Sequence, residues 1–204
     1  MELMHLDYLN PLLTHFEPVS LEEMNAVRLM NRIDTKYTTS IDLLPAILLS
    51  LQKDYRIQEI TCRRNMPYET TYLDTEGRDM FMAHQNGRTV REKIRVRTYK
   101  DSGLTFLEVK NKNNKGRTDK KRILVSNLLN LQEEGAEDFL QKYAWYSLSQ
   151  LSGKLQNSFN RITLVNKQMT ERLTIDTNVC FQDLLTGQQA TMDQVAIIEL
   201  KRDG

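Results

Sequence analysis

The sequence predicts an α+β fold in which mostly antiparallel strands form a β-barrel with a few helices packed outside it. Residues 91–99 and 104–112 alternate charged and apolar side chains on either side of the turn Lys100–Gly103, which indicates a β-hairpin. Several other segments alternate in the same way, while helical spacing occurs only in short stretches. A chain of 204 residues is long enough to bury one sizeable core.

The elements before the hairpin are expected to be short. Ser20 and Glu23 form a capping box that predicts a helix to about residue 29. A strand follows in the segment RIDTKYTTS, and a helix capped by Ser40 or Asp42 should run to Leu51. Two further strands and a short helical turn are predicted at 55–64, 66–75 and 78–87.

The elements after the hairpin begin with a third basic strand, from about 117 to 125. Apolar residues at roughly helical spacing predict two helices within 127–152, which we expect Gly135 to separate and Gly153 to end. The chain then alternates again, which predicts strands at 158–167, 172–181 and 195–201.

The composition excludes several kinds of protein. Cys62 and Cys180 lack metal-type spacing and are expected to be reduced thiols, and the three histidines form no ligand cluster. The sequence shows no signal peptide and no apolar run long enough to cross a bilayer, so we expect a cytoplasmic protein. The net charge of +1 argues against a general nucleic-acid coat.

The positive charge is concentrated in one part of the chain. Residues 88–122 hold thirteen Lys and Arg residues against four acids, a net charge of +9. Charged residues alternate in at least six predicted strands, which solvent-facing surfaces would explain for any one strand. The recurrence, with an excess of arginine, favours an inward-facing charged surface. Such a surface needs a polyanion or interior carboxylates to offset it, and Glu108, Glu199 and Asp34 are the candidates.

Eight segments carry a resemblance to a known family. The chain resembles the VTC-type polyphosphate polymerase domain, a branch of the CYTH-like triphosphate tunnel metalloenzymes. The matching segments, in the order of the family, are RIDTKY (32–37), TYLDT (71–75), the run from His84 to Arg97, FLEVK (106–110), GRTDKKR (116–122), SFNRITLV (158–165), RLTID (172–176) and IIELK (197–201).

This resemblance implies a single VTC-like tunnel domain over residues 1–204 whose basic side chains grip a triphosphate or polyphosphate. The phosphate ligands it implies are Lys36, Arg95, Arg97, Lys110, Lys120, Arg122, Arg161 and Lys201. Of these, Arg95, Arg97, Lys110, Arg161 and Lys201 are the implied catalytic residues. Glu199 is the implied ligand of a divalent metal, Mn²⁺ or Mg²⁺, and ATP with polyphosphate or tripolyphosphate are the implied partners.

The sequence also departs from the family pattern. Phe159 replaces a tyrosine, and Arg32 and Asp34 stand where the wider superfamily has two glutamates, which favours the VTC branch. The family continues beyond the last matching strand with a helix and a strand that carries a Ser-Lys pair. We therefore expect a domain truncated at its C-terminus, lacking its last strand and open at one seam. A fragment of that kind would bind phosphate with little or no activity.

The leading hypothesis is transfer of the terminal phosphate of ATP to a polyphosphate chain. The alternatives are an inorganic or nucleoside triphosphatase of the tunnel superfamily and a non-enzymatic polyphosphate-binding module. RNA binding is disfavoured because the basic strands contain few aromatic residues for base stacking. The sequence does not indicate an oligomeric state.

Overall fold

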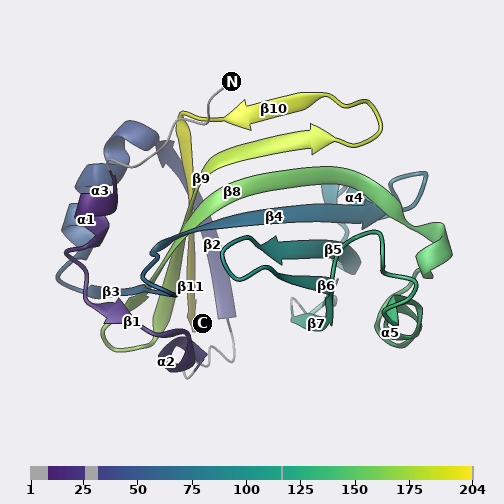
Figure 1. The fold of residues 1–204 in the computed structure, drawn as a ribbon, viewed down its shortest axis with the longest axis horizontal. Coiled ribbons are helices and arrows are strands. Elements are labelled where there is room, and N and C mark those ends of the chain that lie inside the picture. Colours follow the sequence, from purple (N-terminus) through teal and green to yellow (C-terminus); the bar gives the residue numbers. More distant parts are fainter. Residues whose placement is uncertain (1–8, 26–31, 116, 204) are drawn as a thin grey trace. The chain divides into compact units, whose positions relative to one another are not determined.

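The computed structural model describes residues 9–25, 32–115 and 117–203 (Figure 1), and the chain forms two compact units. Unit 1 contains residues 1–67, 159–180 and 191–204, and unit 2 contains residues 68–158 and 181–190. Strands β4 (Asn65–Asp74), β8 (Ser152–Asn166) and β9 (Glu171–Asp183) contribute residues to both units.

Unit 1 is built on an antiparallel ladder in the order β2-β11-β9-β8. Strand β2 spans Arg32–Ser40 and β11 spans Val195–Asp203. Two short strands extend the ladder beyond β8, with β3 (Tyr55–Gln58) pairing to β8 and β1 (Pro18–Val19) pairing in parallel to β3. Strand β10 (Gln189–Met192) pairs with β9.

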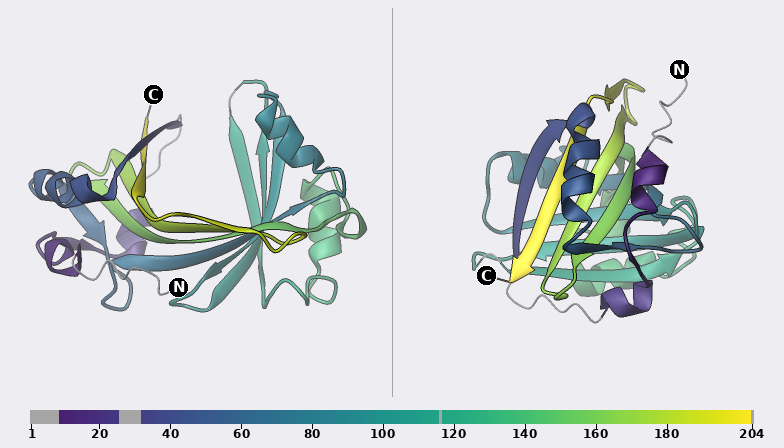
Figure 2. Two further views of the ribbon diagram at one scale, coloured as in Figure 1. Left: turned by 90° about the horizontal axis from the view of Figure 1, so that it is seen from above. Right: turned by 90° about the vertical axis from the view of Figure 1, so that its left-hand side faces the viewer.

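Short helices cover one face of the unit 1 sheet, as the right-hand view of Figure 2 shows for α1 (Asn10–Leu13) and α3 (Leu44–Leu51). Apolar side chains from these helices pack against the apolar face of the strands and form a buried core. The main core residues are Leu9, Leu13, Phe16, Leu44, Leu48, Ile162, Leu164, Leu173 and Ile175. Helix α2 (Leu21–Asn25) begins at the Ser20–Glu23 capping box, as predicted.

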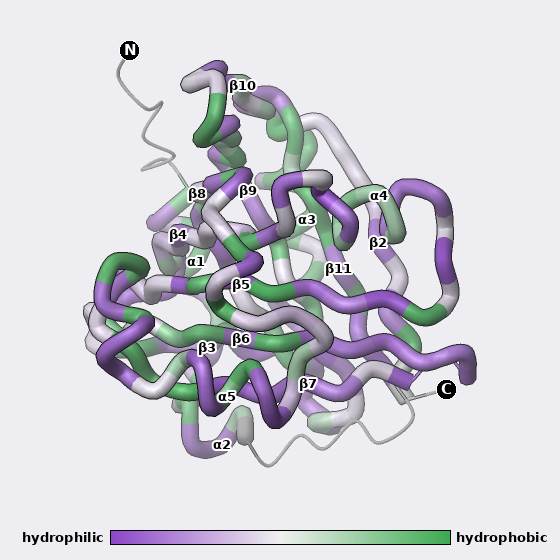
Figure 3. Tube along the Cα trace, turned by 90° about the vertical axis from the view of Figure 1, so that its right-hand side faces the viewer, coloured by the Kyte–Doolittle hydropathy of each residue, from purple (hydrophilic) through white to green (hydrophobic). Residues whose placement is uncertain are grey.

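Unit 2 is built on the ladder β4-β5-β6-β7, with β5 at Arg91–Tyr99, β6 at Leu104–Lys112 and β7 at Thr118–Val125. Helix α5 (Ala136–Tyr143) covers one face of β6 and β7 (Figure 3), and helix α4 (Asp79–Gln85) contacts β5. The buried core between helices and strands contains Leu73, Met80, Ile94, Val96, Leu107, Val109, Phe139 and Leu140.

The pairing register separates each unit's sheet into an apolar and a polar face. In unit 2, Ile94 lies opposite Val109 and Val96 opposite Leu107, and all four face the helices. The alternate residues of the same strands therefore share the opposite face, because side chains alternate along a strand. This is the arrangement that the sequence predicted for the hairpin.

Three predicted elements need correction. The strand predicted at 55–64 ends at Gln58, since Thr61 and Cys62 take positive φ angles in a loop. Residues 127–135 form turns in place of a helix, because the Asn127 side chain accepts hydrogen bonds from two following backbone N–H groups. Gly135 precedes α5, and Gly153 lies in β8 and ends no helix. Residues 26–29, into which the first predicted helix extended, lie outside the described residues.

The predicted fold class is confirmed as α+β with a mostly antiparallel sheet. The described strands pair in an open order that starts at β2 and ends at β7, so this sheet is not closed. None of the described helices has the length and apolar character needed to cross a membrane.

Candidate functional site

The polar face of unit 2 carries a dense set of cations. On this face of β5, β6 and β7, Glu108 is the one carboxylate, as the pairing register of these described strands shows. The cations that share the face are Arg91, Lys93, Arg95, Arg97, Lys110, Lys112, Lys120 and Arg122. Five of the eight predicted phosphate ligands, Arg95, Arg97, Lys110, Lys120 and Arg122, therefore lie on one sheet face.

Glu108 lies at the centre of this polar face with a side chain that is 1% exposed. Its Oε2 accepts a hydrogen bond from Nε of Arg95 at 2.7 Å, and Lys120 forms an ion pair with its other oxygen. Burial alone would raise the pKa of Glu108, but the charges of Arg95 and Lys120 outweigh burial and lower it. Glu108 is therefore charged near neutral pH and offsets part of the positive charge around it.

Arg97 is held by neutral groups on the neighbouring strand and is 8% exposed. Its Nε donates to Oγ1 of Thr70 at 3.0 Å, and its guanidinium lies 5.7 Å from the centroid of the Tyr68 ring. Arg122 is exposed, with its guanidinium 4.4 Å from the centroid of the Phe106 ring. These contacts hold two forked donors on the polar face while their charge stays available to an anion.

Tyr72 is a residue of this face that sequence reasoning did not single out. It lies opposite Arg95 in the pairing of β4 with β5. Burial would raise the pKa of its phenol, but Arg95 and Arg97 outweigh burial and lower it. Its alternation with Thr70 in the segment TTYLD was the available signal, since both residues share a strand face.

The polar face of unit 1 carries a second group of charges, on β2, β11 and β9. Lys36 lies opposite Glu199 in the β2–β11 pairing, with Nζ 3.8 Å from a carboxylate oxygen, and Lys201 forms an ion pair with the same carboxylate. Burial would raise the pKa of Glu199, but Lys201 and Lys36 outweigh it and lower the pKa. Burial lowers the pKa of Lys201 despite the nearby carboxylate.

Arg161, also in unit 1, makes a bidentate ion pair with Asp176. Its Nε and an Nη atom each lie 2.6 Å from one oxygen of that carboxylate. The Phe159 ring, which stands where the resemblance implies a tyrosine, lies beneath the guanidinium at 5.0 Å. Asp176 was not among the predicted site residues, although its position two residues after Thr174 places both on one face of β9.

A divalent metal has one predicted ligand, Glu199, and the surrounding residues limit how it could bind. Among the described residues, no group of three or more His, Cys, Asp or Glu side chains is arranged to hold a metal ion. Mg²⁺ usually binds through one or two carboxylates and takes its other ligands from phosphates and water. The residues present therefore fit a metal that arrives with a phosphate substrate and do not fit a preformed all-protein metal site.

Each unit thus brings several predicted ligands together with a carboxylate that occupies some of them. Unit 1 contains Lys36, Arg161, Lys201 and Glu199, and unit 2 contains Arg95, Arg97, Lys110, Lys120 and Arg122. Planar guanidiniums suit bidentate contacts to phosphate oxygens, and ammonium groups suit point contacts along an anionic chain. Neither polar face contains the nucleophile–base pair of a covalent catalyst among the groups described here, so binding and charge stabilisation are the chemistry that these residues offer.

Comparison with known proteins gave two kinds of match. The family model of the VTC domain matches residues 31–204. No curated protein matches the chain.

Two solved structures share the fold. The first is a putative adenylate cyclase from Bacillus halodurans, with 16% identity and a TM-score of 0.54 over 86% of this chain and 83% of that one. The second is a putative adenylate cyclase from Vibrio parahaemolyticus, with 11% identity and a TM-score of 0.50 over 87% of this chain and 78% of that one. At these identities the likeness concerns the fold alone.

Proposed function

The chain belongs to the VTC domain family, whose model covers residues 31–204, and from this premise we propose that it is a metal-dependent phosphotransferase that extends polyphosphate with the terminal phosphate of ATP. The residues proposed to bind the phosphates are the predicted ones, Lys36, Arg95, Arg97, Lys110, Lys120, Arg122, Arg161 and Lys201. Glu199 is the proposed metal ligand.

The observation that supports this proposal is the polar face of unit 2, where eight cations share a surface with Glu108 as the one carboxylate of β5–β7. Cations at this density repel one another, and a linear polyanion relieves the repulsion along its whole length. A single phosphate monoester would meet only a few of these side chains. The length of the cationic surface therefore favours a substrate with several consecutive phosphates.

The reaction needs positioning and charge neutralisation and no covalent step on the protein. A terminal oxygen of the polyphosphate attacks the γ-phosphorus of ATP, a new P–O bond forms, and the bond to the ADP oxygen breaks. Arg95 and Arg97 hold phosphate oxygens by forked N–H donors, so the chain end and the γ-phosphate stay in line. Lys110 and Lys120 offset the negative charge that the two polyanions bring together.

A bound divalent metal supplies charge neutralisation at phosphate oxygens when it is present. Glu199 would hold it, and Lys36 and Lys201 would then transfer from that carboxylate to phosphate oxygens. Their present pairing with Glu199 keeps the carboxylate charged and its two neighbours near it. The protein side chains bind and orient the phosphates, and each cation that loses its carboxylate gains an anionic oxygen.

The direct experiment is incubation of the protein with ATP, a short polyphosphate primer and Mn²⁺ or Mg²⁺, with polyphosphate length and free phosphate measured together. We expect longer polyphosphate and stoichiometric ADP with little free phosphate. A control with Arg95→Ala and Arg97→Ala combined should lose both products. Rapid release of phosphate from tripolyphosphate without chain growth would instead assign the triphosphatase reaction. Tight polyphosphate binding without either reaction would assign the non-enzymatic binding module.

A further inference from the structure

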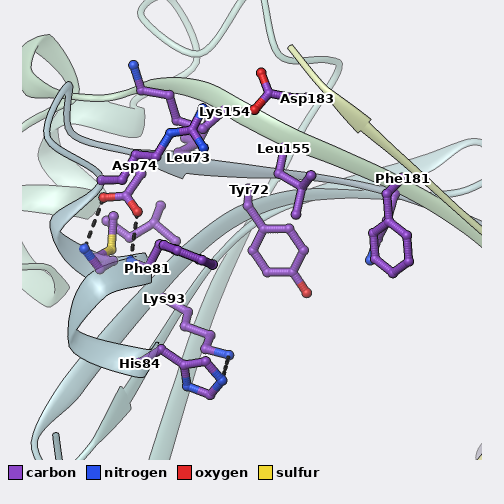
Figure 4. A pocket seen from close by; sticks show the side chains of 14 residues that line it. Tyr72, Leu73, Asp74, Phe81, His84, Lys93, Lys154, Leu155, Phe181 and Asp183 are labelled. Carbon is purple, nitrogen blue, oxygen red and sulfur yellow. Dashed lines mark hydrogen bonds and ion pairs between the residues drawn. The ribbon is translucent and has the colours of Figure 1, made fainter. Parts of the chain in front are cut away.

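A cavity of about 310 Å³ lies in unit 2 beside helix α4 (Figure 4). Its walls come from β4, β5, β8, β9 and α4, and all of the lining residues belong to unit 2. None of the eight predicted phosphate ligands lines it. The volume lies at the lower end of the range typical of small-molecule sites.

Three aromatic rings make much of the cavity wall. Figure 4 shows Tyr72 from β4, Phe81 from α4 and Phe181 from β9 around the open space, with Leu155 from β8 beside them. The Phe81 side chain is unusual because 52% of this apolar residue is exposed at the cavity. An exposed aromatic ring gains free energy when a flat ligand stacks on it, since both surfaces leave water.

Polar groups in the wall are few and separated. The side-chain oxygen of Asn157 is buried and has no hydrogen-bond partner among the described residues, and Asn157 lines the cavity. A buried polar atom without a partner is costly unless a ligand or water pairs with it. At the opposite part of the lining, Nζ of Lys93 lies 3.5 Å from Nε2 of His84.

The cavity adjoins the cationic face through two shared residues. Lys93 lines the cavity and lies two positions before Arg95 on β5, about 7 Å along the strand. Tyr72 lines the cavity and lies directly opposite Arg95 on β4. A ligand that fills the cavity with a flat group can therefore place an attached phosphate chain on Arg95 and its neighbours.

We propose that this cavity binds the adenine base of the nucleoside triphosphate donor. The base stacks on Phe81, and Asn157 pairs with the N6/N7 edge, because a carboxamide matches the donor and acceptor of that edge. Lys93 contacts the first phosphate that leaves the cavity. The inference rests on the proposed function for its phosphate contacts and adds a base-recognition site that tripolyphosphate cannot use.

A purely aliphatic ligand fits these observations less well. It would cover Phe81 but leave the Asn157 oxygen without a partner, and it would make no use of Lys93. A heteroaromatic ring with a hydrogen-bonding edge and an anionic tail uses all three groups. That combination is the chemistry of a nucleotide.

The test compares ATP with tripolyphosphate by calorimetry on wild-type protein and on Phe81→Ala. We expect Phe81→Ala to weaken ATP binding about tenfold, as loss of one stacking contact does, and to leave tripolyphosphate binding unchanged. Phe81→Trp should restore ATP affinity because it restores the ring. Met82→Ala is the matched control, since Met82 is a half-exposed neighbour on α4 that does not line the cavity.

A second variant tests the edge contact. Asn157→Ala should weaken ATP binding and reduce the preference for ATP over GTP. Equal loss of ATP and tripolyphosphate in Phe81→Ala, or no change in either, would overturn the base site while leaving the phosphotransferase proposal intact. If wild-type protein instead binds ADP with Phe81 dependence but neither binds nor uses tripolyphosphate, the base site stands and the proposed function fails.

Discussion

Glu108 determines how the cations of unit 2 are distributed between internal pairing and ligand binding. It is almost fully buried and holds Arg95 and Lys120 at once. Breaking a buried ion pair leaves the partner charges uncompensated, which is more costly than losing an exposed pair. The same carboxylate competes with phosphate oxygens for the same two cations. Stability and anion affinity therefore oppose each other at this residue.

Replacing Glu108 by glutamine should separate these two effects. We expect Glu108→Gln to lower the free energy of unfolding by about 1–3 kcal/mol, because Arg95 and Lys120 lose their charged partner. The affinity for tripolyphosphate should rise, because no carboxylate then competes for them. Urea unfolding and calorimetry measure the two quantities. Glu69→Gln removes the more exposed ion pair with Lys100 and should change neither, and a fall in affinity in Glu108→Gln would contradict the argument.

Arg97 offers a second test at the residue scale. Arg97→Ala removes a nearly buried guanidinium from the cationic face and should weaken tripolyphosphate binding roughly tenfold to a hundredfold, the range for a hydrogen bond to a charged group. The loss of stability should be smaller, near that of the single hydrogen bond to Thr70. Binding is followed by calorimetry and folding by thermal melting. Lys121→Ala is the control, since Lys121 lies on the opposite face of β7 beside Tyr143, and equal effects in both variants would refute the assigned faces.

Among the elements, the β5–β6 hairpin follows its sequence closely because two local signals agree. Alternation fixes which side chains share a face, and the turn Lys100–Gly103 fixes the register, with Gly103 at a positive φ of 68°. Residues 127–135 show where such reasoning fails. Their apolar residues have helical spacing, but the Asn127 cap favours turns, and packing of Leu131 into the unit 2 core explains the apolar content. The segment at 59–64 breaks for a similar local reason, at the positive φ angles of Thr61 and Cys62.

Helix α4 depends on a carboxylate that precedes it by several residues. Asp74, at the end of β4, accepts hydrogen bonds from the backbone N–H groups of Met80 and Phe81 at 3.0 and 2.9 Å. Asp74→Ala removes this cap and should lower the free energy of unfolding by about 0.5–2 kcal/mol. Because α4 carries Phe81, ATP affinity should also fall, while tripolyphosphate affinity should not. Melting curves and calorimetry provide the check, and a variant with unchanged stability would show that the cap is dispensable.

Over the whole molecule, the sequence predicts which residues are charged and which strand face each occupies, but not how the charges pair. The faces follow from the two-residue period alone, so the cationic face of unit 2 could be predicted. The pairing of Arg161 with Asp176 depends on the register between β8 and β9, which no local signal in either strand specifies. The cavity beside α4 depends on residues from five elements, so its lining follows from tertiary structure. The roles proposed for all of these residues remain predictions until binding is measured.

The two buried carboxylates also predict how the stability of the molecule depends on pH. Cations next to Glu108 and Glu199 lower both pKa values below the ordinary value of 4.5. A carboxyl with a folded-state pKa below its unfolded value contributes stability that is complete above the unfolded pKa and is lost as the pH falls through the folded value. We therefore expect the free energy of unfolding to decline as the pH is lowered from about 4.5. Urea unfolding at a series of pH values between neutrality and acid measures this decline. The Glu108→Gln variant should show a shallower decline than the wild type, because one of the two carboxyls no longer titrates, and parallel curves would mean that Glu108 carries no such linkage.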